Sequence, residues 1–317
     1  AFTLYPHFKH KKDYRQAMAY LQLANQWQRA QFSYDHHAEL AEHRAIQQAF
    51  SPLLLANTSQ YHQHSDNDTN NQQNASIFIC GLPRSGTTLV EQIIATHSSV
   101  TAGDELLELA QATQHSLTKI QPKQAFPHWA NELNTEDWQD IGANYMQLTQ
   151  HLQSKRYFTD KMPLNYKAIG LISKALPQAK IIYCSRHPMD IIFGCFKQHL
   201  GQGHQFAYDL NELTEMLIAH QQLMQYWIEH LPHKIFILKY EDLIDNQEAI
   251  SRQLLAFLDL DWQPQCLTFY SNNNTVHTIS NSQIRQPLFT HGKQNWLRYQ
   301  QQLQPYADKL HQAGLKF

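Results

Sequence analysis

The sequence has few charged residues and no long apolar runs. Only 16% of the 317 residues are Asp, Glu, Lys or Arg, and the formal net charge is −2. A chain so close to neutral has no global field that would attract nucleic acid or a membrane surface. No apolar run reaches the ~18 residues of a membrane-spanning helix. We therefore expect neither nucleic acid nor a membrane as a partner.

Cysteine is also scarce, with four residues in the chain. They lie far apart, form no CxxC motif, and two of them, Cys80 and Cys184, lie in apolar strand-like runs. We interpret them as buried thiols in a reducing compartment. The chain shows no signal peptide from Ala1 onward, so a cytoplasmic location is expected.

Histidine, by contrast, is abundant, with 20 residues. The tightest pairs are His36-His37 and His62-x-His64. Neither pair has cysteines or carboxylates around it at ligand spacing. We predict a polar surface and no metal site.

The first part of the chain has helical periodicity. Apolar residues recur at helical spacing over 13–30 and again over 35–56, where Asp35 is a plausible N-cap. The two segments predict a helical hairpin that resembles part of a tetratricopeptide repeat, although a generic amphipathic hairpin fits almost as well. A polar stretch follows. The predicted organisation is a helical region over 1–61, a linker over 62–75 and a second domain over 76–317.

From residue 76 onward, strand patterns alternate with helix patterns. Strands are predicted at 76–80, around 157–163, at 180–186 and at 234–243, with helices from 88, over 164–176, from 188, over 210–231 and over 246–260. This alternation predicts a P-loop-type α/β fold, a parallel sheet flanked by helices. Ligands of such sheets bind beyond the carboxyl ends of the strands.

The first strand leads into Gly-Leu-Pro-Arg-Ser-Gly-Thr-Thr, residues 81–88, which we call the phosphate loop. It follows the template G-x-x-x-x-G-K-[ST], except that Thr87 stands in place of the lysine. Backbone N–H groups at a helix N-terminus attract an anion, and glycines let the backbone approach it. The lysine normally reaches the β- and γ-phosphates, so its loss favours a ligand without a γ-phosphate. A purely structural glycine turn is the alternative.

A second basic position follows the strand at 180–186. Arg186 ends this strand in "CSRHPMDIIFGCF", directly before a helix with Pro188 in its first turn. A guanidinium at the ligand edge of the sheet suits a phosphate. Taken alone, Arg186 could equally cap a neighbouring carboxylate.

Five segments together resemble a known family. "GLPRSGTTLVEQIIATHSSVTAGDE", "FTDKMPLNY", "KIIYCSRHPMDIIFGCFKQ", "LKYEDL" and "SNSQIRQPLFTHGKQNWLRY" occur in this order. The same order is found in sulfotransferases that use 3′-phosphoadenosine 5′-phosphosulfate, abbreviated PAPS. The chain resembles above all the bacterial tetratricopeptide-containing sulfotransferases, and next the tyrosylprotein sulfotransferases, over roughly residues 76 to 300.

The resemblance implies that the donor PAPS is bound without a metal. Its 5′-phosphosulfate would be held by Arg84, Ser85, Gly86, Thr87 and Thr88, its 3′-phosphate by Arg186, and its nucleotide also by Tyr240, Arg285 and Lys293. Two positions depart from the family. Gly194 replaces a serine that contacts the 3′-phosphate, so that contact is lost or made by a backbone N–H. Asn295 replaces a basic residue before Trp296, and Lys293 is expected to substitute for it.

The resemblance also assigns catalytic roles. Glu105 is the expected general base, with Asp104 as the alternative, and His199 and His204 as minor candidates. Lys161 would neutralise the leaving oxygen, and Ser280 would contact the donor near the transferred group. Both acids could instead be ordinary N-terminal helix residues, and Lys161 a surface lysine.

The expected activity is transfer of a sulfuryl group to an acceptor hydroxyl, with a protein or peptide tyrosine favoured. Aromatic and amide residues between 200 and 230 are expected to line the acceptor cleft. A small-molecule or sugar hydroxyl is an alternative. A P-loop kinase or triphosphatase and a non-catalytic binding module are the rival classes.

Overall fold

The computed structural model describes residues 2–56, 75–201, 203–271, 286, 288 and 293–317, and it contains a parallel sheet of five strands within these ranges. The strand order is β2-β3-β1-β4-β5. The strands are β1 (Ala75–Cys80), β2 (Val100–Thr101), β3 (Tyr157–Asp160), β4 (Lys180–Ser185) and β5 (Ile235–Lys239). The parallel α/β fold predicted from the sequence is confirmed.

The central strand β1 is buried on both faces of the sheet. Ile77 pairs with Thr159 of β3 on one side and with Lys180 of β4 on the other. Ile77 and Ile79 point into one apolar cluster, and Phe78 and Cys80 into the other. Successive strand side chains alternate between faces, so the continuous apolar run "SIFIC" supplies both cores.

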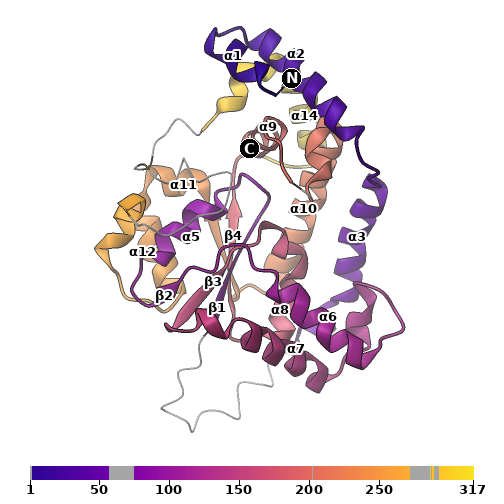
Figure 1. Cartoon of the computed structure of the whole chain (residues 1–317), viewed down its shortest axis with the longest axis vertical. Helices are drawn as coiled ribbons and strands as arrows, with labels where there is room; N and C mark the ends of the chain where they lie inside the picture. Colours follow the sequence, from indigo (N-terminus) through magenta and orange to yellow (C-terminus); the bar gives the residue numbers. More distant parts are fainter. Residues whose placement is uncertain (1, 57–74, 202, 272–285, 287, 289–292) are drawn as a thin grey trace.

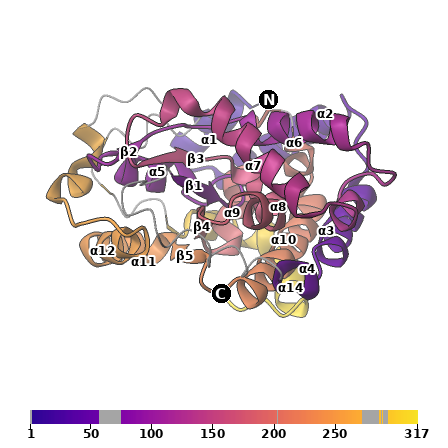
Figure 2. The same ribbon diagram turned by 90° about the horizontal axis from the view of Figure 1, so that it is seen from below.

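Each face is covered by its own helices (Figures 1 and 2). The smaller cluster lies under α5 (Thr87–Ala95), α11 (Tyr240–Asp245), α12 (Gln247–Phe257) and η6 (Pro264–Ser271). The larger cluster involves α6 (Glu108–Ile120), α7 (Thr135–Leu148), α8 (Ile169–Ala175), α9 (Pro188–Phe196), α10 (Leu210–His230), η8 (Asn295–Tyr299) and α14 (Gln300–Gln312). Short 3₁₀ segments connect them: η2 (His128–Asn131), η3 (Gln150–Leu152), η4 (Pro163–Ala168) and η5 (Gln205–Tyr208). Among the described helices, none is both long enough and apolar enough to cross a membrane.

The N-terminal helices belong to the larger core. They are α1 (Leu4–His10), α2 (Tyr14–Arg29), α3 (His36–Ala49) and α4 (Pro52–Ala56). Met18 and Leu21 of α2 and Ile46 of α3 are fully buried in the same cluster as β1. The predicted hairpin is open: α2 packs on α1, η5 and η8, whereas α3 packs along α10 (Figure 1). The two apolar faces find larger apolar surfaces on the main body than on each other.

The helical elements predicted from residue 88 onward are all present, within a few residues at their ends. The strand predicted at 234–243 is shorter, because α11 begins at Tyr240 directly after β5. The short edge strand β2 and the helices α6 and α7 were not predicted. All four cysteines are buried as free thiols. Of the linker predicted at 62–75, residues 62–74 lie outside the described ranges and Ala75 already belongs to β1, so the domain division remains a prediction.

Candidate active site

The phosphate loop joins β1 to α5 at the carboxyl edge of the sheet. Gly86 is the N-cap of α5 and has φ 107°, in the left-handed region that favours glycine. A Cβ there would lie 2.8 Å from the ring of Tyr240. Ser85 is fully buried, and its hydroxyl finds no hydrogen-bond partner among the described residues. The loop therefore presents an unused buried donor beside the N-terminus of a helix, which suits a compact anion.

Two arginines and a tyrosine meet at this loop. Arg186, after β4, donates from Nη1 to the carbonyl oxygen of Arg84 at 2.8 Å. Its guanidinium carbon lies 4.2 Å from the ring centroid of Tyr240. Three segments distant in the sequence thus bring Arg84, Gly86, Arg186 and Tyr240 together. These are four of the residues that the resemblance assigned to the donor.

The charge balance at this point favours a bound anion. Burial lowers the pKa of Arg84, and the positive charge of Arg186 lowers it further, although the neighbouring Cys195 and Tyr240 act the other way. A bound anion such as a phosphate would relieve this repulsion and could accept bidentate hydrogen bonds from a guanidinium group.

Helix α9 packs against the phosphate loop. A Cβ at Gly194 would lie 3.2 Å from Cβ of Arg84, so this glycine lets α9 approach the arginine closely. Cys195 donates from Sγ to the carbonyl of Pro83 at 3.2 Å. Burial raises the pKa of Cys195 to about 12, so we expect an unreactive thiol. Gly194 therefore contacts the loop directly. Whether its backbone contacts a phosphate stays a prediction.

A second cluster lies at the ends of β2 and β3. The Lys161 side chain is completely buried, and its Nζ lies 2.7 Å from Glu105 Oε1 and 2.8 Å from Asp104 Oδ1. Burial alone would lower the pKa of Lys161, but the negative charges of Glu91, Asp104 and Glu105 outweigh it and raise the pKa. Lys161 is thus held as a cation. The alternative interpretation of Lys161 as a surface lysine is wrong, because its side chain is buried.

Two buried carboxyl groups near this cluster were not predicted from the sequence. Burial raises the pKa of Glu91 to about 7 and that of Asp160 to about 8. Glu91 lies on α5, four residues after the helix begins at Thr87. Asp160 is the last residue of β3, next to Lys161. The only signal available was a charged residue within an otherwise apolar run.

Of the other residues predicted to bind the donor, some lie in the described ranges and some do not. Lys293 forms an ion pair with Asp245, at the end of α11, and its role at the nucleotide stays a prediction. Asn295 begins η8, and the indole of Trp296 stacks on His187. Ser280 and Arg285 lie outside the described residues.

The candidate histidine bases are placed differently. His204 is half-buried, and burial lowers its pKa, while the charges of Glu105 and Glu39 act in the opposite direction. It therefore lies within electrostatic reach of the predicted base. His199 instead contacts the rings of Phe2 and Tyr208.

Within the described ranges, no three His, Cys, Asp or Glu side chains gather as a metal site would require. The predicted lack of a metal stays a prediction, because some of the chain lies outside those ranges.

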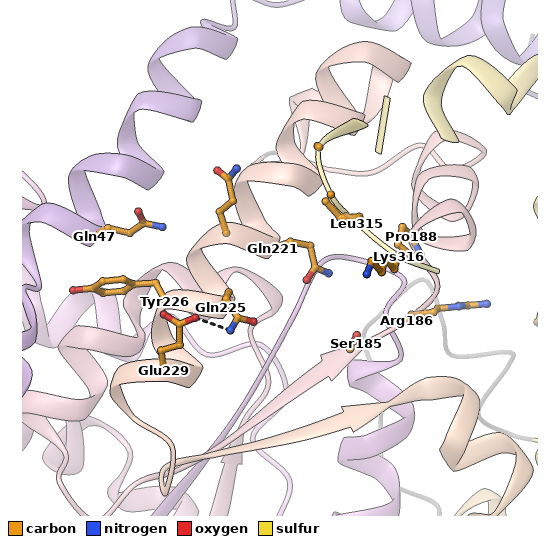
Figure 3. A pocket seen from close by; sticks show the side chains of 13 residues that line it. Gln47, Ser185, Arg186, Pro188, Gln221, Gln225, Tyr226, Glu229, Leu315 and Lys316 are labelled. Atoms are coloured by element: carbon orange, nitrogen blue, oxygen red, sulfur yellow. Dashed lines mark hydrogen bonds between the residues drawn. The ribbon is translucent and has the colours of Figure 1, made fainter. Parts of the chain in front are cut away.

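A cavity of about 700 Å³ lies between α3, α10 and the C-terminal residues 313–316 (Figure 3). Its lining is mostly polar and includes four glutamines, Gln47, Gln221, Gln222 and Gln225. Gln225 Nε2 donates to Glu229 Oε1 at 2.8 Å. The lining includes Arg186 but neither Lys161 nor Glu105. Amide residues between 200 and 230 thus line a cavity that includes Arg186 and excludes the lysine cluster.

Searches against known proteins match the same region. A model of the sulfotransferase family matches residues 76–264. An uncharacterized protein of Aquifex aeolicus is 29% identical over 99% of this chain and 41% of its own length. Protein-tyrosine sulfotransferase 1 of Danio rerio is 23% identical over 60% of this chain and 55% of its own length. The chain thus spans about half the length of these two relatives.

A hydroxysteroid sulfotransferase is a further relative, and a solved structure has the same fold. The 3-alpha-hydroxysteroid sulfotransferase of Cavia porcellus is 23% identical over 68% of this chain and 67% of its own length. The solved sulfotransferase domain of the Synechococcus PCC 7002 olefin synthase is 18% identical, with a TM-score of 0.52, and covers 76% of this chain and 96% of the domain. With the family match covering the phosphate loop, Lys161, Arg186 and Tyr240, the chain belongs to the sulfotransferase family.

Proposed function

We propose that the protein transfers a sulfuryl group from PAPS to an acceptor hydroxyl. The observation that carries this proposal is the meeting of the phosphate loop with Arg186 and Tyr240 at the N-terminus of α5. Arg84, Ser85, Thr87 and Thr88 would hold the 5′-phosphosulfate, and Arg186 the 3′-phosphate. The adjacent arginines and the unused Ser85 hydroxyl support a dianionic ligand here.

The donor supplies an activated sulfuryl group whose displacement leaves a phosphate oxygen. In this proposal the protein contributes mainly position and charge. Lys161 would balance the negative charge that develops on the departing oxygen. Glu105 would accept the proton of the acceptor hydroxyl from the opposite side of its carboxylate, because its Oε1 is engaged by Lys161 and its side chain is 46% exposed.

The acceptor class is proposed as a phenolic hydroxyl, in particular a tyrosine of a protein or peptide. Relatives named as protein-tyrosine sulfotransferases support this choice. A relative named as a hydroxysteroid sulfotransferase keeps a small-molecule hydroxyl as the second candidate. Ser280, Arg285 and Lys293 keep their proposed roles around the donor.

Calorimetry tests the donor. 3′,5′-Adenosine bisphosphate should bind in the absence of a divalent metal, and Mg-ATP should bind at least ~100-fold more weakly, because the loop lacks the lysine that serves a γ-phosphate. Comparable or tighter binding of Mg-ATP would favour the P-loop kinase class instead.

A transfer assay tests the chemistry and separates catalysis from mere binding. Labelled PAPS is offered with a tyrosine peptide, a simple phenol, a steroid and an oligosaccharide. The wild-type chain should label the tyrosine peptide or the phenol, and Glu105→Gln should label neither while binding the bisphosphate with unchanged affinity. Full turnover by Glu105→Gln would show that Glu105 is not the base.

A further inference from the structure

The turn that carries Glu105 is held to the rest of the protein at consecutive backbone positions. Gly103 N–H donates to Thr159 Oγ1 at 3.0 Å, and Asp104 N–H donates to Glu91 Oε1 at 3.0 Å. The carbonyl of Asp104 accepts from Lys161 N–H at 2.9 Å. Asp104 itself has φ 59°, a left-handed conformation that costs a non-glycine residue energy and therefore needs such support.

Glu91 is the side chain at which these restraints converge. Only 1% of its surface is exposed, and the same oxygen that accepts from Asp104 accepts from the Thr159 hydroxyl at 2.7 Å. Thr159 in turn accepts from Gly103. One buried carboxylate oxygen thus connects helix α5, strand β3 and the turn at 103–105.

We propose that Glu91 is a positioning residue, which fixes the turn so that Glu105 meets both Lys161 and the acceptor. It acts through hydrogen bonds to the turn and does not need to touch donor or acceptor. Because α5 begins at the phosphate loop, the same helix that receives the phosphosulfate also places the proposed base. The catalytic part of this inference rests on the proposed function; the mechanical part does not.

Two variants of similar volume separate hydrogen bonding from charge. Glu91→Gln keeps an oxygen that can accept from both Asp104 and Thr159, whereas Glu91→Met removes the acceptor and leaves the space filled. Thr96→Ala is the control at the C-cap of the same helix, since the bond that its hydroxyl makes among the described residues goes to the carbonyl of Gln92 in α5, at 2.8 Å.

The mechanical effect is measured by amide hydrogen exchange in a peptide spanning residues 100–108. In Glu91→Met this peptide should exchange at least ~10-fold faster than in the wild type, because the Asp104 amide loses its acceptor. Glu91→Gln and Thr96→Ala should exchange at the wild-type rate. This measurement requires no acceptor and no activity.

The catalytic effect is measured by turnover of PAPS with whichever acceptor the wild-type chain labels. Glu91→Met should lose about 100-fold in kcat, as misplacement of a reacting group by about 1 Å does, while its Kd for adenosine bisphosphate stays within ~3-fold of wild type. Glu91→Gln should restore kcat to within ~3-fold of wild type.

The outcomes distinguish the two proposals. Unchanged exchange in Glu91→Met, or wild-type kcat with accelerated exchange, overturns the positioning role while leaving the proposed function intact. Loss of kcat in Glu91→Gln as large as in Glu91→Met would assign the effect to charge and also overturns it. If Glu91→Met does not fold, Glu91→Ala, which also removes the acceptor of the Asp104 amide, is measured instead, and the same faster exchange is required. A wild-type chain that neither binds the bisphosphate nor transfers sulfate refutes the proposed function and the catalytic part of this one.

Discussion

At the scale of single residues, the site depends on close approach as much as on charge. Gly86 and the ring of Tyr240 touch where the phosphate loop turns into α5, and the guanidinium of Arg186 lies over that ring. The tyrosine therefore holds the arginine and the loop in one arrangement. A side chain added at Gly86 would overlap the ring of Tyr240.

Gly86→Ala is expected to weaken binding of adenosine bisphosphate by more than 10-fold. The new Cβ would require a left-handed alanine and would displace Tyr240, and with it Arg186. Calorimetry with the bisphosphate measures the loss. Gly201→Ala is the matched control, since a Cβ at Gly201 meets nothing within 4 Å. Equal affinities for Gly86→Ala and wild type would mean that the loop does not hold the nucleotide.

Lys161→Met should slow transfer by at least ~100-fold and change the affinity for adenosine bisphosphate by less than ~5-fold. The ammonium is proposed to act on charge that appears only during transfer, and the spent nucleotide does not carry the transferred group. The ratio of the two effects is the measurement. A large loss of affinity with unchanged kcat would make Lys161 a binding residue.

At the scale of elements, helix α2 is tied to the layer beneath the phosphate loop. Asn25 is completely buried, and its Nδ2 donates to the carbonyl of Phe196, at the end of α9, at 2.8 Å. It also donates to Leu21 within its own helix. The amide thus satisfies a helix-terminal carbonyl that would otherwise be buried without a partner.

Asn25→Ala should lower the free energy of unfolding by about 1–3 kcal/mol, the cost of leaving a buried carbonyl unsatisfied. Urea denaturation measures it. Leu23→Ala is the control on the same helix, because Leu23 is 55% exposed and should change stability by less than ~0.5 kcal/mol. Equal stabilities of the two variants would show that α2 is only loosely attached.

Sequence patterns predicted the elements that bear the site better than those that frame it. The strands β1, β4 and β5 could be predicted because each carries an apolar run. Arg186 and Tyr240 could be singled out because they directly follow β4 and β5. Strand β2 has two residues and no periodicity to detect. Helices α6 and α7 lie between the motifs and rely on each other for burial. The role of Glu91 depends on tertiary contacts, which no local pattern encodes.

At the scale of the whole molecule, buried carboxyl groups should make stability depend on pH. Burial raises the pKa of Asp160 from 3.8 to about 8, although hydrogen bonds from Tyr145 and Asn165 oppose the shift. The folded state therefore binds a proton that the unfolded chain releases near pH 4. The resulting stabilisation is complete below pH ~4 and is lost as the pH rises through about 8.

Urea denaturation at pH 5, 7 and 9 measures the fall in the free energy of unfolding that Asp160 contributes in the wild type. Asp160→Asn keeps a neutral polar group at this position and should make the fall shallower between pH 5 and 9. The raised pKa of Glu91 adds a smaller decline with the same sign, below about pH 7. Identical slopes for wild type and Asp160→Asn would mean that Asp160 is ionised in the folded protein throughout this range.

The burial of Met18, Leu21 and Ile46 together with the central strand has a consequence for how the chain can be divided. A polypeptide starting at residue 75 would leave apolar surface of α9 and α10 facing water, so we expect it to aggregate. The same polypeptide produced alongside a separate piece ending at residue 56 should recover a folded complex held without a peptide bond. The N-terminal helices supply none of the proposed donor or catalytic residues, yet they cover apolar surface of the helices that pack against those residues.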